Sequence, residues 1–529
     1  MSSTGRRDTP RWVAPLGEAL AEALPRLYGT PAPGPLLELI EALTKALERG
    51  ELTLDLRGPA PEGTSPEGWP EVHRRALEAS PLGRAPHGPL ALEGFRVGWR
   101  RWHSLRGVVM EGLVARAQRR HPSPGWEPPA SLADPQQRRA VATAVERDLL
   151  VLAGGPGTGK TSTVAHILKA VAQQQKGTRI HLAAPTGKAA ARLRAATAGQ
   201  WPCTTLHQLL ESRGEGEFRR NRQRPLKLDL LVVDEVSMVD LVLMEAVLAA
   251  LPQEARLVLV GDPAQLPPVA PGAPLQELLQ DEELRERLDG AVVTLQTTYR
   301  NAGAIAAVAA ALREQIHGEG KPAADPIGRV RPQLAGLGSK ANVRWVEAGL
   351  GRLPPEVESQ LRTHMQALAA AAEACTAGTA HGWSALSALR DGLLVLTPRH
   401  RGPWGVEAVH RQLLGDAAAA NLALWPNGTP VLCTRNLHDR GLSNGDLGVL
   451  VAGEDRWLVF GQDDPIWLHP SQLTGVLEPA LALTVHKAQG SEAERVIVLL
   501  PEPVGADARL LYTALTRARQ EAWLVTPAE

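Results

Sequence analysis

A glycine-rich loop between an apolar run and a helix-forming run carries the clearest chemistry in this sequence. Residues 152–161 read Leu-Ala-Gly-Gly-Pro-Gly-Thr-Gly-Lys-Thr, after the apolar run 148–152 and before the helix-forming run 162–169. Glycines allow successive backbone N–H groups to curl around a phosphate, and the positive end of the next helix lies behind them. Lys160 would reach the β- and γ-phosphates, and the Thr161 hydroxyl would ligate Mg²⁺. The residues predicted to bind the nucleotide here are Gly155, Pro156, Gly157, Thr158, Gly159, Lys160, Thr161 and Ser162.

Two adjacent carboxylates, Asp234 and Glu235, follow a second apolar strand at residues 227–233. Asp234 is suited to hold Mg²⁺ through its water shell, and Glu235 to polarise the attacking water as general base. An acidic pair at the mouth of an apolar strand costs free energy unless a cation or a reaction uses it. Nucleotide hydrolysis therefore explains the pair better than a structural role does.

Length and composition are typical of a large protein of three or four compact units. The chain has 529 residues, 44% of them hydrophobic, and a formal net charge of zero. No run of eighteen apolar residues is present, and residues 1–7 lack the apolar core of a secretory signal, so we expect a cytoplasmic protein without a membrane partner. Three scattered cysteines predict neither a disulfide framework nor a zinc site. Because the net charge is zero, nucleic-acid binding must be argued from local sites.

Strands that alternate with helical segments from residue 135 to about 300 predict a parallel α/β sheet around the glycine-rich loop. Its further strands are expected at 179–184, 228–233 and 256–260. A second α/β unit follows, with strands expected at 392–396 and 522–525.

Two intervals of the second half have a different pattern. Residues 427–478 contain short apolar runs separated by Asn-Gly, Gly-Asp and Asp-Asp turns, which predicts a small inserted β-barrel. Residues 318–350 are rich in Gly and Pro and predict a connector or a loosely structured insertion.

The N-terminal part, to about residue 110, forms a unit of its own. Leucines at helical spacing between 36 and 47 predict an amphipathic helix, and the alternating run 51–56 predicts a strand. Residues 95–106 interleave Arg with aromatic side chains, which could bind nucleic acid, although we favour a solvated edge strand or a partner-binding surface. Prolines between 122 and 129 mark a linker.

Further short segments occur in an order that resembles the motifs of superfamily 1 helicases. They are Gln137, residues 184–192, 204–208, 261–267, 295–300, 483–492 and 511–519. The sequences Asp-Glu-Val-Ser-Met-Val-Asp at 234–240, Asn-Gly-Asp at 444–446 and Thr-Val-His-Lys-Ala-Gln-Gly at 484–490 resemble the RecD branch. Residues 46–56 also resemble the N-terminal domain of the alpha subunit of the RecBCD helicase–nuclease, exodeoxyribonuclease V.

This resemblance implies an α/β fold with two RecA-like parallel-sheet motor domains. It adds an N-terminal helical or mixed domain and a small SH3-like β-barrel inserted in the second motor domain. The implied divisions are an N-terminal partner-docking domain at 1–115, a linker at 116–134, motor domain 1 at 135–300, motor domain 2 at 301–427 and 479–529, and the insertion at 428–478.

The resemblance also implies roles at the ATP site. Gln137 reads the adenine edge, Tyr299 stacks on the base, and Gly490 and Glu492 contact phosphate and ribose. Arg300 and Arg517 reach the γ-phosphate as arginine fingers, because a guanidinium fork matches phosphate oxygens and stays charged. Gln265 couples the state of the γ-phosphate to domain closure. A plainer alternative for Arg517 is a salt bridge on a C-terminal helix.

Residues that the resemblance places along single-stranded DNA are Pro185, Thr186, Lys188, Thr205, His207, Arg399, Asn444 and His486. Hydroxyls, amides and backbone N–H groups suit phosphate contacts, so we expect sequence-tolerant, salt-sensitive binding. The two histidines could instead be ordinary packed side chains, although we favour DNA contact. The Arg-rich segment 211–224 could be a strand-separating pin or a solvated loop.

We expect an ATP-dependent DNA helicase or translocase that uses ATP and Mg²⁺ on single-stranded DNA and duplex ends, and the resemblance to the RecD branch implies that it moves in the 5′-to-3′ direction. We favour a RecBCD-type subunit for DNA recombination and repair of DNA damage, with RecB-like and RecC-like partners docked on the N-terminal domain and the nuclease site on a partner. A free-standing RecD-like helicase is the alternative. A non-motor nucleotide-binding subunit is a third reading, and Glu235, Arg300 and Arg517 argue against it.

Overall fold

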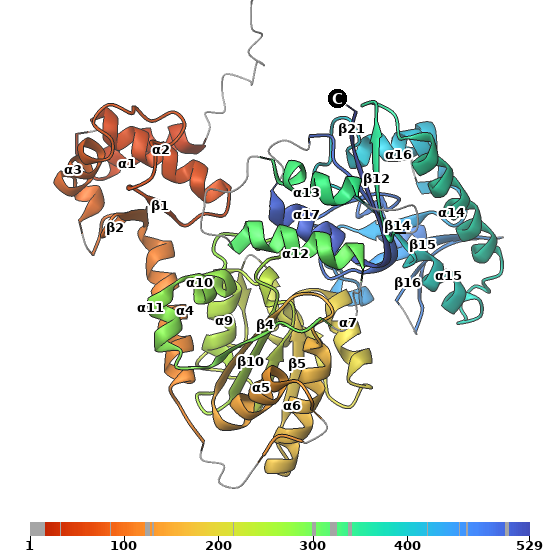
Figure 1. The fold of residues 1–529 in the computed structure, drawn as a ribbon, viewed down its shortest axis with the longest axis horizontal. Coiled ribbons are helices and arrows are strands. Elements are labelled where there is room, and N and C mark those ends of the chain that lie inside the picture. The colour runs from red at the N-terminus through yellow and green to blue at the C-terminus, as the bar shows by residue number, and fades with distance from the viewer. Residues whose placement is uncertain are drawn as a thin grey trace, which may run out of the picture.

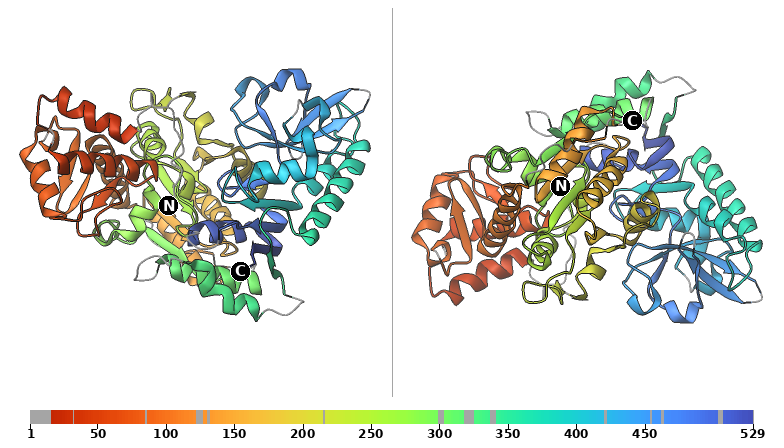
Figure 2. Two further views of the ribbon diagram at one scale, coloured as in Figure 1. Left: turned by 90° about the horizontal axis from the view of Figure 1, so that it is seen from above. Right: turned by 90° about the horizontal axis from the view of Figure 1, so that it is seen from below.

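The computed structural model describes residues 16–31, 33–84, 86–121, 127–129, 132–214, 216–298, 303–317, 325–336, 341–419, 422–453, 455–461, 464–502 and 507–528. Figure 1 shows an N-terminal unit joined by one long helix to a first α/β domain, which is followed by a second α/β domain with an inserted sheet. The two views of Figure 2 show the N-terminal unit and the second α/β domain on opposite sides of the first.

The first α/β domain is built on a six-stranded sheet with the order β11-β4-β10-β9-β5-β6, in which all neighbouring strands are parallel. Its strands are β4 (Leu149–Gly154), β5 (Ile180–Ala184), β6 (Cys203–Thr205), β9 (Leu230–Val233), β10 (Arg256–Gly261) and β11 (Val292–Leu295). Its helices are α5 (Pro135–Glu146), α6 (Lys160–Gln174), α7 (Gly187–Ala196), α8 (Leu206–Leu209), α9 (Leu241–Ala250), α10 (Pro274–Gln280) and α11 (Glu282–Arg287).

Side chains of the sheet form two cores, one on each face. Leu149 and Val151 of β4 belong to the core that includes α9, whereas Leu150 and Leu152 belong to the core that includes α5 and α6. Because both faces are covered, the central strands are continuous apolar runs, as is typical of parallel sheets. The predicted parallel α/β sheet is confirmed.

The N-terminal unit combines three helices with a small antiparallel sheet of order β1-β3-β2. Its elements are α1 (Leu16–Leu27), α2 (Gly34–Glu48), β1 (Thr53–Asp55), α3 (Glu71–Ala79), β2 (Leu90–Glu93) and β3 (Arg96–Trp99). The helix and the strand expected near residues 36–47 and 51–56 are therefore present.

The interpretation of residues 95–106 as an edge strand is wrong. β3 is the central strand of its sheet and pairs with β1 on one side and β2 on the other. The chain then enters α4 (Arg100–Ala117), and the Arg100 guanidinium donates hydrogen bonds to the carbonyl oxygens of Gly83, Gly88 and Leu90. This arginine is therefore used to hold the unit together.

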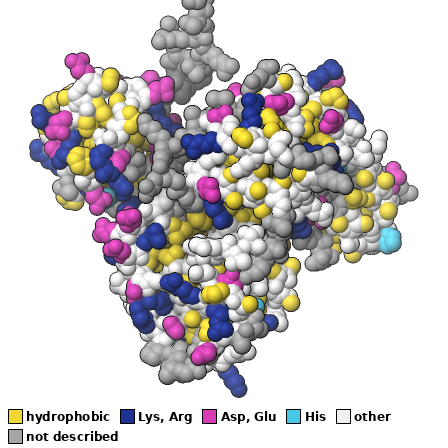
Figure 3. All heavy atoms as spheres, viewed as in Figure 1, with side chains coloured by type: hydrophobic (Ala, Val, Ile, Leu, Met, Phe, Trp, Pro, Cys, Tyr) yellow, Lys and Arg dark blue, Asp and Glu magenta, His cyan; other side chains and the backbone are white. Residues whose placement is uncertain are grey.

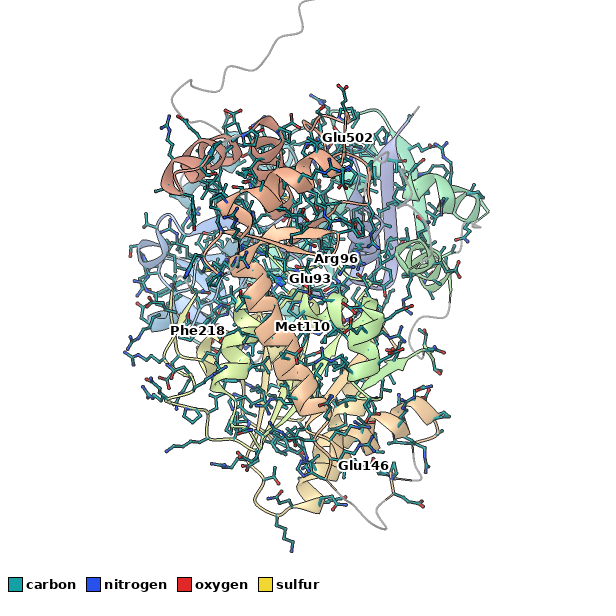
Figure 4. The ribbon with its side chains drawn as sticks, turned by 90° about the vertical axis from the view of Figure 1, so that its left-hand side faces the viewer. Glu93, Arg96, Met110, Glu146, Phe218 and Glu502 are labelled. Carbon is teal, nitrogen blue, oxygen red and sulfur yellow. The ribbon has the colours of Figure 1, made fainter. Side chains whose placement is uncertain are left out.

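Helix α4 packs against the first α/β domain. Val109, Met110 and Leu113 are buried in the same core as α9, and Figure 4 shows Met110 on α4 where the helix crosses this domain. Arg106 also forms ion pairs with Glu277 of α10 (2.5 Å) and with Asp281. The N-terminal unit is thus connected to the first α/β domain by a packed helix.

The second α/β domain has a five-stranded sheet of order β12-β21-β20-β13-β19, again with all neighbours parallel. Its strands are β12 (Val343–Ala348), β13 (Leu393–Thr397), β19 (Leu483–Thr484), β20 (Ala493–Leu499) and β21 (Ala518–Pro527). Its helices are α12 (Ala304–His317), α13 (Pro326–Ala335), α14 (Pro355–Glu373), α15 (Trp383–Arg390), α16 (Val406–Leu414) and α17 (Ala508–Leu515).

The description of residues 318–350 as a loose connector is wrong for its described part. This interval holds α13, whose first turn is capped by Asp325, and β12, which pairs with β21 along six residue pairs. Gly and Pro lower the local propensity, but pairing with β21 supplies the partner that stabilises the strand. Amino-acid composition alone therefore did not predict the helix and the strand of this interval.

Five short antiparallel strands are inserted between β13 and β19, in the order β17-β16-β15-β14-β18. They are β14 (Pro430–Cys433), β15 (Leu447–Ala452), β16 (Arg456–Phe460), β17 (Ile466–Leu468) and β18 (Leu477–Pro479). The predicted short strands are present. In the described part of the chain β17 and β18 remain the two edges, so the SH3-like barrel stays a prediction.

The surface carries charges of both signs. Figure 3 shows Lys and Arg side chains interspersed with Asp and Glu over the face that it presents. Among the helices that the structure describes, none has the length and apolarity required to cross a membrane.

Candidate active site between the two α/β domains

The glycine-rich loop connects β4 to α6 and holds Lys160 at the first position of that helix. Gly157 and Gly159 have φ angles of 72° and 82°, a left-handed region that favours glycine. The Lys160 ammonium donates hydrogen bonds to the carbonyl oxygens of Gly154 (2.7 Å) and Gly155 (2.9 Å). The turn geometry and the cation at a helix N-terminus fit a phosphate chain.

The acidic pair lies at the carboxyl end of β9, which is separated by β10 from β4, the strand that leads into the glycine-rich loop. Burial and the charge of Glu235 raise the pKa of Asp234 to about 6. Glu235 itself has a left-handed backbone with φ of 53°, which costs on the order of 1–3 kcal/mol in a residue other than glycine. A buried carboxylate with a raised pKa fits a bound cation, so Asp234 and Thr161 would hold Mg²⁺, whose charge would offset that of the phosphates.

Gln265 lies beyond the end of β10 and is 4% exposed. Its Nε2 is 3.5 Å from Asp262 Oδ2, and its Oε1 has no hydrogen-bond partner among the described residues. A buried unpaired oxygen costs about 1–3 kcal/mol, so this amide is poised to gain a partner when the site is filled. The geometry fits a residue that responds to nucleotide.

The second domain binds the loop 262–266 of the first domain through α17. Tyr512 donates a hydrogen bond of 2.8 Å to Asp262 Oδ2, and Thr513 Oγ1 accepts one of 2.9 Å from the Leu266 N–H. Arg509 donates to the carbonyl oxygen of Pro263. The loop that carries Gln265 is therefore held by both domains.

Arg313 of α12 is a site residue that the sequence reasoning missed. Its Nη2 lies 3.2 Å from the Tyr512 hydroxyl, and a Cβ placed on Gly155 would be 1.8 Å from the same nitrogen. A second-domain guanidinium thus lies directly against the glycine-rich loop. The available sequence signal was weak: Arg313 directly follows the buried Leu312 in an alanine-rich helix.

The remaining predicted ATP-site residues are placed as follows. Gln137 is buried in the first turn of α5. Arg517 is 3% exposed and donates to the carbonyl oxygens of Thr513 (3.2 Å) and Ser491 (3.4 Å), so its guanidinium lies within the second domain. Tyr299 and Arg300 lie outside the described residues.

The predicted DNA contacts Thr186 and Lys188 meet the second domain at the start of α7. Thr186 caps the helix through Ala189, and the Lys188 ammonium donates a hydrogen bond of 2.9 Å to Ser491 Oγ. Burial lowers the pKa of Lys188 to about 8.

These residues border a cavity of about 380 Å³ between the domains, lined by Lys188, Thr205, Arg390, Ser443, Asp446 and Ser491 among others. The cavity brings the start of α7, the cap of α8 and the turn next to Asn444 together. Pro185 directly precedes this wall in the chain.

Arg399 and His486 lie just beyond the carboxyl ends of β13 and β19 in the second domain. They follow Thr397 and Thr484 by two residues, and these two threonines are paired between β13 and β19. Arg399 forms an ion pair of 2.5 Å with the exposed Glu502. Both predicted DNA contacts therefore lie at the carboxyl ends of neighbouring strands.

The segment 211–224 forms a short hairpin of β7 (Ser212–Gly214) and β8 (Glu217–Phe218). Glu211 pairs with Arg220 and Arg224 at its base, and the rings of Phe218 and His207 lie 6.1 Å apart. Figure 4 labels Phe218 near the edge of the molecule. These contacts are compatible with a pin and with a solvated loop.

Comparison with known proteins identifies the family. A model of the AAA domain matches residues 137–271, and a model of the UvrD-like helicase C-terminal domain matches residues 479–525. The RecBCD enzyme subunit RecD of Mycolicibacterium smegmatis is 36% identical, over 92% of this chain and 89% of that protein. The ATP-dependent RecD2 DNA helicase of Deinococcus radiodurans is 34% identical, over 70% of this chain and 46% of that protein.

Among solved structures, that of two coordinating Pif1 helicases at forked duplex DNA is 18% identical. Its TM-score is 0.41, over 75% of this chain and 92% of that one. The match to the RecD subunit extends over most of both proteins at more than 30% identity. The chain therefore belongs to the RecD family of ATP-dependent DNA helicases.

Proposed function

We propose that this chain is an ATP-driven motor that moves in the 5′-to-3′ direction on single-stranded DNA. The observation that carries the proposal is the contact of Tyr512 and Arg313 of the second domain with Asp262 and Gly155 of the first. A nucleotide on the glycine-rich loop would lie at the boundary between the two α/β domains. Its phosphates can therefore change how the two domains contact each other.

The proposed cycle uses residues of both domains. Lys160 and the backbone N–H groups of the loop bind the phosphates, and Glu235 accepts a proton from the attacking water. Arg517 and Arg300 bind the γ-phosphate and so close the cleft between the domains. Gln265 responds to the presence of the γ-phosphate and passes the change to loop 262–266, which contacts α17. The predicted DNA contacts near α7 and those at the carboxyl ends of β13 and β19 would bind DNA tightly in turn. Domain closure would then move the protein along the DNA strand.

We further propose that the chain acts as the RecD-like subunit of a RecBCD-type helicase–nuclease in repair of double-strand breaks. The match to the mycobacterial RecD subunit covers 92% of this chain, whereas the match to the Deinococcus RecD2 helicase covers 70%. This difference favours the subunit over a free-standing helicase. The N-terminal unit would dock RecB-like and RecC-like partners, and the nuclease site would belong to a partner.

The experiment that tests the motor measures ATP hydrolysis and unwinding by the purified chain on duplexes with a 5′ or a 3′ single-stranded tail. Stimulated hydrolysis with unwinding from the 5′ tail alone is the expected result for an independently competent motor. Hydrolysis without unwinding supports a subunit that needs its complex, and copurification then identifies the partners. Unwinding from the 3′ tail alone would contradict the proposed polarity.

A further inference from the structure

Three side chains along the first half of α7 and its N-cap contact three consecutive residues of the second domain. A Cβ on Gly490 would lie 2.9 Å from Thr186 Oγ1, Lys188 Nζ is 2.9 Å from Ser491 Oγ, and Arg192 Nη2 is 2.7 Å from Glu492 Oε1. The residues follow each other in the same order on both sides. This face of α7 is therefore a continuous inter-domain contact.

Arg192 extends this contact to the proposed general base. Its Nη1 lies 3.9 Å from Glu235 Oε1 and 3.3 Å from the carbonyl oxygen of Gly490. One guanidinium thus bridges the carboxylate of Glu235 in the first domain and that of Glu492 in the second. Burial lowers the pKa of Arg192, but Glu492, Glu235 and Asp234 outweigh it and the net shift is upward, so the bridge stays charged.

We propose that Arg192 is the positioning residue through which DNA bound at the start of α7 controls the general base Glu235. This inference rests on the proposed function, because it assigns the cause of the DNA dependence of hydrolysis. Arg192 would contact neither DNA nor nucleotide itself. It would act by fixing where the carboxylate of Glu235 points.

The helix supplies the mechanical link. Thr186 and Lys188 are proposed to bind DNA phosphates, and Arg192 lies one turn beyond Lys188 on the same helix. DNA that fixes the first turn of α7 therefore also fixes the guanidinium that bridges Glu235 and Glu492.

Glu235 lies in a left-handed turn between β9 and the next short helical turn, a strained conformation for a residue other than glycine. The guanidinium of Arg192 is a neighbour that can fix the direction of its carboxylate. A displacement of about 1 Å of a catalytic group can lower a rate by up to roughly 10²-fold.

The test compares steady-state ATP hydrolysis by the full chain with and without oligo-dT for Arg192→Gln, Arg192→Lys and the control Arg194→Gln. Arg194 lies on the same helix but is exposed and donates to the Cys203 carbonyl oxygen. We expect Arg192→Gln to lower the DNA-stimulated kcat by roughly ten- to a hundredfold, with smaller changes in the unstimulated kcat, the KM for ATP and the Kd for oligo-dT.

Arg192→Lys tests the bridge without removing the charge. An ammonium is a compact donor that cannot span two carboxylates as a planar fork does, so an intermediate loss of stimulation is expected. Glu492→Gln removes the other end of the bridge and should lower stimulation similarly. The double variant Arg192→Gln/Glu492→Gln should be no worse than either single variant, because both remove the same connection.

The inference and the proposed function fail in different ways. Wild-type hydrolysis that oligo-dT stimulates, together with unchanged stimulation in Arg192→Gln, overturns the inference alone. Equal loss of stimulated and unstimulated kcat in both Arg192 variants also overturns it, because Arg192 would then support the active site regardless of DNA. A wild-type chain without hydrolysis, both alone and with its partners, overturns the proposed function and the inference with it. Melting temperatures identify any variant that fails to fold, in which case Arg192→Lys decides.

Discussion

The Tyr512 hydroxyl lies between Asp262, to which it donates at 2.8 Å, and Arg313, whose Nη2 is 3.2 Å away. Tyr512 is buried, and both burial and Asp262 raise its pKa, so the hydroxyl stays protonated. This series of contacts connects Asp262, beyond the end of β10 in the first domain, through Tyr512 and Arg313 of the second domain to Gly155 of the glycine-rich loop. The two domains thus share the wall of the proposed ATP site.

Tyr512→Phe should therefore weaken domain coupling. The change removes the hydroxyl from Asp262 and Arg313 while the ring volume is nearly kept, and unpaired buried partners cost about 1–3 kcal/mol. We expect a lower melting temperature and reduced DNA-stimulated hydrolysis. Tyr28→Phe is the control, because the Tyr28 hydroxyl also donates a hydrogen bond, to the His87 carbonyl oxygen, but at an exposed position. Equal effects of both changes would refute the coupling role of Tyr512.

Arg313→Gln should slow ATP hydrolysis by about 10²-fold, the effect typical of losing one group that stabilises developing charge. The reason is the position of its guanidinium against Gly155. Gly155→Ala should reduce the rate as well, since its Cβ would displace Arg313. The control is Arg329→Gln, an exposed arginine on α13. Single-turnover hydrolysis measures the effect, and a wild-type rate in Arg313→Gln would show that the contact has no part in the reaction.

His410 predicts a pH dependence of stability in the second domain. Its Nε2 accepts a hydrogen bond of 3.2 Å from the Ala482 N–H, and burial lowers its pKa to about 4, with Glu478 opposing the shift and His400 and Lys487 adding to it. An unfolded histidine titrates near 6.5, so the unfolded state binds the proton first as the pH falls. The stabilisation is present above about pH 6.5 and is lost progressively toward pH 4.

Urea unfolding should therefore show this contribution falling by about 2 kcal/mol between pH 7.5 and 5. His410→Gln keeps an acceptor for the Ala482 N–H but cannot titrate, so its stability should vary less over this range. His381→Gln, at an exposed position, should retain the wild-type dependence. Identical pH profiles for the wild type and His410→Gln would contradict the assignment.

The sequence predicted local features well and long-range ones poorly. The glycine-rich loop between β4 and α6 and the strand before Asp234 are contiguous signals, and both elements lie where they were expected. The position of β3 as a central strand depends on pairing with β1 and β2, which no local pattern encodes.

Contacts between the domains explain the site residues that the sequence did not reveal. Arg313 reaches Tyr512 across 199 residues of sequence, and Arg192 reaches Glu492 across 300. Charged side chains on amphipathic helices are usually solvated, so the sequence did not predict what these two arginines contact, although Arg192 lies in the helicase-like segment 184–192. Their roles follow from the packing of one domain on the other.

Lys160 and Glu235 are proposed to drive a DNA-dependent ATPase, so ATP hydrolysis stimulated by single-stranded DNA should depend on both residues. We expect oligo-dT to stimulate the wild-type chain, alone or with its partners. Lys160→Ala should abolish that hydrolysis while the melting temperature stays near wild type, and Glu235→Gln should bind ATP with little turnover. Lys169→Ala, an exposed lysine on the same helix α6, should behave as wild type. DNA-stimulated hydrolysis that survives in Lys160→Ala would show that the glycine-rich loop does not drive the motor.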